Sequence, residues 1–304
     1  MSGPPLSLTW FGCTTFRIEV AGRTLFFDTY VDRPPGLPEV GLSAADVTEA
    51  DLVFISHAHF DHMLGADTIA ANTGALVVGS HETVHVLRDN GVPEAQLLRV
   101  SGGEPVDCGG GVTVRVVPAL HSCLFGSGSS PDSATECLGD LGIKAQERAA
   151  STAAIFGLLS QASPELAAWF ADTGPRCSHH DGGQLAYLLE TPEGTIFVSA
   201  SSGGWTPLLR ELRPDVAILA LAGRPNVDGE PFQGSLAQFL LAQVELLKPG
   251  TVVLCHHDAL LPPLLPAIDT EHALALLARE AGHATHVDLA YGDPVDILRT
   301  PRKG

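Results

Sequence analysis

The segment "ISHAHFDHMLGA" (residues 55–66) places three histidines and an aspartate within six consecutive positions. It continues the apolar run "DLVFIS", which predicts a buried strand. His57 and His59 are two residues apart, so on an extended segment both side chains face the same side and can bind one ion. Asp61 and His62 follow where a helix is expected to begin, and they would point toward a neighbouring position. Imidazole with a carboxylate is a ligand set that Zn²⁺ prefers, so the cluster predicts a metal centre at the end of a buried strand.

Short β-rich runs alternate with helical patterns along most of the chain. The first third contains "LSLTWFG", "FRIEV" and "TLFFD", and the second half contains "LAYLLE", "TIFVSA", "DVAILAL" and "TVVLCH". Turn residues separate these runs, and helical patterns lie between or after the later ones. Because no glycine-rich nucleotide-binding loop interrupts the series, the alternation predicts sheets that pack as a sandwich under a cover of helices.

The pattern His-x-His-x-Asp-His after a buried strand resembles the signature of the metallo-β-lactamase superfamily. Later segments are similar in the same order: "FFDTYVDR" would carry a supporting carboxylate at Asp28, "VPALHS" would deliver His121, and "VVLCHHD" would deliver His256. The soluble, small-substrate branch that includes ascorbate-phosphate lactonases looks most similar. The resemblance implies an α/β fold, an αββα sandwich of two mixed sheets covered by helices, with the site at one edge of both sheets.

The same resemblance implies two metal ions. The first ion would bind to His57, His59 and His121, and the second to Asp61, His62 and His256. His257 is an alternative to its neighbour His256, because two consecutive residues of a strand cannot both face the site. The implied cofactor is Zn²⁺ in both positions, with Mn²⁺ or Fe as alternatives.

The chain departs from the family at "FVSASSGGW" (residues 197–205). Most hydrolytic members have Gly-Asp-Thr here, and the aspartate bridges the two ions, although one subclass of true metallo-β-lactamases also has serine and binds two zinc ions. Ser201 offers no carboxylate at neutral pH, so we expect the second ion to bind more weakly than the first. Ser201 could instead donate a hydrogen bond to a bound water. Asp258 is either a substitute ligand or a solvated residue after the strand.

Residues 122–183 interrupt the alternation and predict an insertion within a single domain (1–304). "SCLFGSGSSPDS" consists of small residues typical of flexible loops, and the residues after it predict one or two helices, with Pro164 starting the second. The insertion is a candidate lid over the site, or a passive surface element. His180 near its end would contact substrate in the first case and lie in a polar loop in the second.

A second histidine pair, "HETVH" (residues 81–85), matches the zincin pattern of metalloproteases. Ser80 would cap a helix that carries both His81 and His85. No third ligand is evident nearby, so we interpret the pair as a solvated helix face.

Composition narrows the classes of partner. Lys and Arg number 17 against 35 Asp and Glu, and the net charge of -18 opposes binding to nucleic acid or to anionic membranes. The N-terminus has no signal-peptide pattern, and no apolar run has the length of a membrane span. The six cysteines form no CxxC motif, which is typical of a cytoplasmic protein with free thiols. Homo-oligomer formation stays open.

Together these features predict a zinc-dependent hydrolase that acts on a small-molecule substrate. A metal-bound hydroxide would attack an ester, lactone, amide or phosphoester, and Asp61 would orient it as well as bind metal. The alternative is a metal-binding or regulatory domain without turnover. Ser201 favours that alternative, whereas six intact candidate ligands oppose it.

Overall fold

Two mixed seven-stranded sheets form the centre of the protein, here a computed structural model that describes residues 6–123, 132–144, 163–262 and 265–299 with isolated positions between 146 and 161. The first sheet has the order β17-β1-β2-β3-β4-β5-β6. Its strands are β1 (Ser7–Trp10), β2 (Phe16–Val20), β3 (Arg23–Phe27), β4 (Leu52–Phe54), β5 (Leu76–Gly79), β6 (Leu97–Arg99) and β17 (Pro294–Val295). Strands β17 and β1–β3 pair antiparallel, and β3–β6 pair in parallel.

The second sheet has the order β16-β15-β12-β10-β9-β8-β7. Its strands are β7 (Pro105–Gly109), β8 (Val112–Pro118), β9 (Leu185–Thr191), β10 (Gly194–Ser199), β12 (Val216–Ala220), β15 (Thr251–Cys255) and β16 (Thr285–His286). Strands β7–β10 are antiparallel, and β10, β12, β15 and β16 are parallel. A small three-stranded sheet contains β11 (Gly203–Gly204), β13 (Asn226–Val227) and β14 (Glu230–Pro231).

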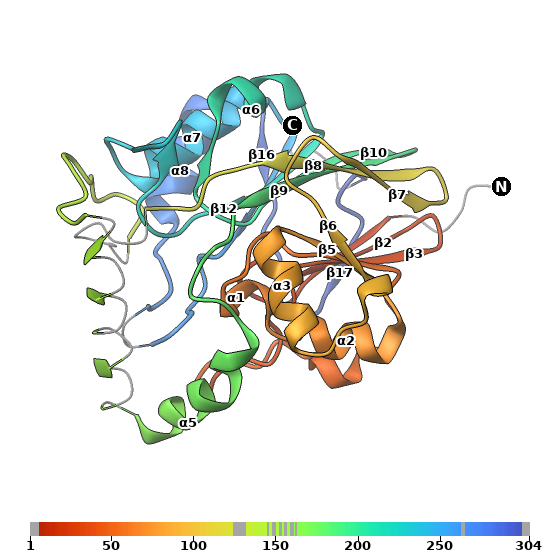
Figure 1. The fold of residues 1–304 in the computed structure, drawn as a ribbon. Coiled ribbons are helices and arrows are strands. Elements are labelled where there is room, and N and C mark those ends of the chain that lie inside the picture. Colours follow the sequence, from red (N-terminus) through yellow and green to blue (C-terminus); the bar gives the residue numbers. More distant parts are fainter. Residues whose placement is uncertain are drawn as a thin grey trace.

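Helices cover the outer faces of both sheets (Figure 1). The orange helices α2 (Ala66–Thr73) and α3 (His81–Asp89) lie on the side of the first sheet, where short α1 (Phe60–Met63) precedes them. The blue-green helices α6 (Thr206–Leu212), α7 (Leu236–Leu247) and α8 (Glu271–Glu280) lie on the side of the second sheet. Helix α5 (Pro164–Thr173) and the 3-10 turns Ala44–Asp46, Glu94–Gln96 and Gly174–Arg176 complete the described helices.

The central strands are apolar on both faces because each sheet packs against the other sheet on one face and against helices on the other. In β3, Leu25 and Phe27 pack into the core between the two sheets, whereas Phe26 between them packs into the core beneath α2. In β12, Ile218 belongs to the core between the sheets and Leu219 to the core beneath α7. Such doubly covered strands produce continuous apolar runs in the sequence, and the predicted αββα sandwich of two mixed sheets is confirmed.

The predicted insertion is described only in part. Helix α5 begins at Pro164, as predicted, and the side chain of Ser163 accepts a hydrogen bond from the Leu166 backbone at its start. Residues 124–131, most of the stretch expected to be flexible, lie outside the described residues, as do many positions of the first expected helix. The lid and the single-domain organisation therefore stay predictions. Within the described part of the chain, no helix is long and apolar enough to cross a membrane.

Candidate metal centre

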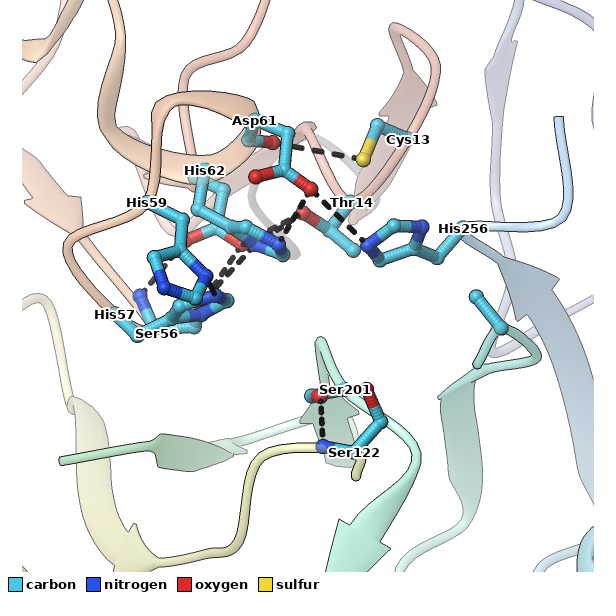
Figure 2. A network of polar contacts seen from close by, with 12 residues as sticks. Cys13, Thr14, Ser56, His57, His59, Asp61, His62, Ser122, Ser201 and His256 are labelled. Atoms are coloured by element: carbon cyan, nitrogen blue, oxygen red, sulfur yellow. Dashed lines mark hydrogen bonds and ion pairs between the residues drawn. The ribbon is translucent and has the colours of Figure 1, made fainter. Parts of the chain in front are cut away.

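The histidine cluster lies where strand ends of both sheets meet at one edge of the sandwich. His57, His59, Asp61 and His62 follow β4 of the first sheet, and the last two lie in α1. From the second sheet, His121 follows β8 and His256 follows β15. Figure 2 shows the side chains of His57, His59, Asp61, His62 and His256 gathered around one small region. The candidate ligands are thus far apart in sequence but close in space.

The first set of candidate ligands contains three imidazoles. Ligand atoms of His57, His59 and His121 all lie within 4.8 Å of one another. His57 Nε2 is 3.0 Å from His59 Nδ1, and the His121 ring centroid is 4.7 Å from that of His57 and 4.9 Å from that of His59. This spacing allows all three to bind one ion.

Burial keeps two of these imidazoles neutral. His57 is fully buried, and burial together with the neighbouring histidines lowers its pKa well below the usual value. Burial and the neighbouring His59 lower the pKa of His121 to about 3. A neutral imidazole has a free lone pair, which is the form that binds a metal ion. These two imidazoles are therefore ready to bind a cation at neutral pH without first losing protons.

The second set surrounds the carboxylate of Asp61. Its Oδ2 lies 3.3 Å from His62 Nε2 and 3.4 Å from His256 Nε2. Burial opposes ionisation of Asp61, but the two histidines hold the pKa of its carboxyl well below the usual range. Burial likewise opposes protonation of His62, but Asp61 and Asp28 raise the pKa of His62 to about 10. This half of the site favours positive charge, whether a proton or a metal ion carries it.

Asp28 fixes the orientation of His62 from behind. Its Oδ2 lies 2.8 Å from His62 Nδ1 and accepts hydrogen bonds from Thr14 Oγ1 and Ser56 Oγ. Its Oδ1 accepts from the backbone N–H of Ser56 at 2.7 Å. Because Nδ1 is held by this carboxylate, Nε2 of His62 points toward Asp61. A carboxylate behind a histidine is a common support for a metal ligand.

The geometry distinguishes the two consecutive histidines after β15. His256 has a φ of 59° and directs Nε2 toward Asp61. His257 instead stacks on Trp10, with ring centroids 5.4 Å apart and planes inclined by 20°. Only His256 therefore joins the second set.

Ser201 lies beside His121 and supports its backbone. Its hydroxyl accepts a hydrogen bond from the Ser122 N–H at 3.0 Å, and in Figure 2 this contact lies apart from the labelled histidines. Gly203 approaches the same segment so closely that a Cβ atom there would lie 2.3 Å from the Leu120 carbonyl oxygen. The stretch that departs from the family pattern thus holds the loop that carries His121.

Asp258 is neither solvated nor part of a candidate ligand set. Its carboxylate is 3.0 Å from Arg33 and accepts hydrogen bonds from the Tyr291 hydroxyl and from the backbone N–H of Cys13. Both expectations for Asp258 from the sequence miss this supporting position.

The structure brings neither His180 nor the zincin-like pair into a candidate ligand set. His180 is exposed, although its segment is fixed to the site by backbone hydrogen bonds between Ala58 and both Ser178 and Asp181. His81 and His85 are exposed on α3, and among the described residues they join no group that could hold a metal ion. This agrees with the interpretation of "HETVH" as a solvated helix face.

Sequence reasoning missed Cys13. Its sulfur joins Asp61, His62 and His256 in a group whose ligand atoms lie within 4.8 Å of one another. The only signal in the sequence is the pair Gly12-Cys13 between two strands, and a glycine before a cysteine does not by itself indicate a ligand.

The sequence is similar to those of known metal-dependent hydrolases. The sequence model of the β-lactamase superfamily domain matches residues 23–141. The chain is 36% identical over 126 residues to a UPF0173 metal-dependent hydrolase of Pyrobaculum calidifontis, an alignment that covers 41% of this chain and 54% of that protein. The chain thus spans about half the length of the curated relatives it matches.

Two solved structures share the fold over nearly the whole chain. The metallo hydrolase Igni18 from Ignicoccus hospitalis has a TM-score of 0.61 and 19% identity, and the alignment covers 96% of this chain and 98% of Igni18. The diiron β-hydroxylase CmlA from Streptomyces venezuelae has a TM-score of 0.59 and 15% identity, and the alignment covers 97% of this chain and 54% of CmlA. At these identities the two structures establish the likeness of fold.

Proposed function

We propose that this chain, which belongs to the metallo-β-lactamase superfamily, is a metal-dependent hydrolase with a two-ion centre. The observation that carries the proposal is the pair of adjacent ligand sets at one edge of the sandwich. His57, His59 and His121 would hold one ion, and Asp61, His62 and His256 would hold the other. The donor atoms fit such ions because the first set offers three imidazole nitrogens and the second carries a carboxylate. Zn²⁺ suits this chemistry best, and Mn²⁺ or Fe are alternatives.

The bound ions would supply Lewis acidity, which lowers the pKa of water and polarises the substrate oxygen. The protein supplies the remaining functions. Asp61 is almost buried between His62 and His256, so its carboxylate can orient a nucleophile by accepting a hydrogen bond and can later receive a proton. Asp28, which is held by three hydrogen bonds from Thr14 and Ser56, keeps His62 in one orientation through its contact with Nδ1. The proposed substrates are small esters, lactones, amides or phosphoesters.

The test is a turnover screen with the purified chain loaded with Zn²⁺, Mn²⁺ or Fe²⁺. Model lactones, esters, amides and phosphodiesters serve as substrates, and metal content is measured in the same samples. Asp61→Asn should lower turnover by about 10²–10⁴-fold. The matched control is Asp51→Asn, because Asp51 forms an ion pair with Arg23 outside the ligand cluster.

Two outcomes would contradict the proposal. Full metal loading without turnover on any substrate would support the alternative, a metal-stabilised binding or regulatory domain. Turnover that survives in Asp61→Asn would remove Asp61 from the mechanism. A cytoplasmic location stays a prediction from the sequence, and homo-oligomer formation stays open.

A further inference from the structure

We propose that Cys13 is a fourth ligand of the second ion and that its thiolate supplies the negative charge that Ser201 cannot. The inference rests on the two-ion centre of the proposed function. It assigns a ligand that comes from the turn between β1 and β2, outside the histidine signature.

The position of the sulfur supports direct ligation. Cys13 is 1% exposed, and its Sγ lies within 4.8 Å of the ligand atoms of Asp61, His62 and His256. The Sγ is also 3.5 Å from the backbone oxygen of Asp61. In Figure 2 the sulfur points toward Asp61, and the His256 ring lies on the same side of the cluster. An ion bound by the other three residues would thus lie close to this sulfur.

The backbone around Cys13 is strained in a way that favours a built site. Cys13 has a φ of 45° and His256 a φ of 59°, values that side-chain-bearing residues rarely adopt. The two residues are joined by a hydrogen bond of 2.9 Å from the His256 N–H to the Cys13 carbonyl. Strained residues of this kind persist where surrounding contacts hold them, and they cluster at functional sites. With Cys13 included, the second set has two such residues, and a backbone hydrogen bond joins them.

Asp258 is the group that holds the Cys13 turn in place. Both of its carboxylate oxygens accept the Cys13 backbone N–H, at 3.0 and 3.1 Å. Arg33 and the Tyr291 hydroxyl bind one of the same oxygens, at 3.0 and 2.7 Å. Asp258 is therefore a positioning residue for Cys13, which explains why a carboxylate so near the site does not face the ligand cluster.

A thiolate changes which ion should bind more tightly. Binding to metal releases the thiol proton to solvent and leaves a sulfur ligand with one negative charge. With Cys13, the second set provides four protein ligands and two negative charges, as in closed structural zinc sites, whereas the three-histidine set keeps an open position. We therefore expect the second ion to be retained longer than the first, which reverses the order predicted from Ser201 alone.

The test is a cobalt titration of the metal-stripped full chain. Thiolate ligation gives Co²⁺ an intense charge-transfer band in the near ultraviolet, and we expect this band with the first equivalent of Co²⁺. Cys13→Ser should lose the band and bind that equivalent at least tenfold more weakly. The matched control is Cys255→Ala, because Cys255 is also buried but packs into the core between the sheets.

X-ray absorption at the zinc edge of the wild-type protein gives an answer that does not depend on any variant. We expect a sulfur neighbour at about 2.3 Å. A spectrum with only nitrogen and oxygen neighbours, or a cobalt band that persists in Cys13→Ser, would overturn the inference. A sulfur ligand in a protein that turns over no substrate would contradict the proposed function but leave this assignment standing.

Discussion

Replacing Asp28 by asparagine should weaken binding of the second ion without changing the shape of the site. Asp28 is 1% exposed, and its carboxylate contacts Thr14, Ser56 and His62 at 2.7–2.9 Å. Asparagine keeps the shape but removes the charge and one acceptor oxygen. The amide would no longer hold Nδ1 of His62 as strongly, so Nε2 would be a weaker and less oriented ligand.

The size of the effect follows from the contacts. Loss of a support of this kind lowers metal affinity by about 10–100-fold, which corresponds to about 1.4–2.8 kcal/mol. A hydrogen bond to a charged group contributes about 1.5–3 kcal/mol to stability, so the free energy of unfolding of the metal-free variant should fall by a similar amount.

The assay is competition for Zn²⁺ between the protein and a chromophoric chelator. The weakening should affect the ion of the second set, because Asp28 contacts none of the three residues of the first set in the described structure. Tyr187→Phe is the control for stability alone: it removes a buried hydrogen bond of 2.6 Å to the Ile55 carbonyl but touches no candidate ligand. An Asp28→Asn protein with unchanged affinity for both ions would refute the reasoning.

Three further predictions concern metal, the zincin-like pair and pH. Exhaustive chelation should lower the melting temperature, since binding to the folded state alone adds stability; an unchanged melt in a protein shown to be metal-free would contradict this. Alanine at both His81 and His85 should leave the metal content per chain unchanged by elemental analysis, and loss of one ion would revive the zincin interpretation. The metal-stripped chain should lose stability in denaturant unfolding as the pH falls below about 6.5, by up to about 1.4 kcal/mol per pH unit for each of His57 and His121. Their pKa values are lowered in the folded state, so the unfolded chain takes up protons first. The raised pKa of His62 adds nothing to this slope, because its contribution to stability is already complete below about pH 6.5. A stability that does not change with pH in this range would argue against neutral, buried imidazoles.

The sequence predicted those features that depend on local pattern. The apolar run before His57 predicted a buried strand, and Pro164 predicted a helix start, because both signals act within a few residues. The likeness to a known family pointed to Asp28 as a supporting carboxylate, and the structure places it behind His62.

Other features depend on contacts between distant segments. Asp258 faces Arg33 and Cys13 because β15 ends beside the turn after β1, and no pattern around Asp258 encodes that proximity. Cys13 was missed for the same reason, because only the fold brings it next to His256, which is distant in sequence. Donation of a hydrogen bond from Ser201 to a bound water stays a prediction. The sequence did not indicate that the same hydroxyl accepts a hydrogen bond from Ser122, a contact that depends on how closely Gly203 allows two backbone segments to approach.

Each candidate ligand set takes residues from both sheets, so a bound ion would act as a crosslink. His62 follows the first sheet and His256 the second, roughly two hundred residues later. By the chain-entropy relation used for disulfides, closing a loop of this length lowers the conformational entropy of an unfolded chain that keeps the link. The free energy of that unfolded chain rises by about 5 kcal/mol. If unfolding releases the ion, the free energy of metal binding stabilises the folded state instead. In either case, when both forms carry the same cavity-forming substitution in the core between the sheets, such as Phe27→Leu or Ile218→Val, the metal-loaded chain should melt at a higher temperature than the stripped chain.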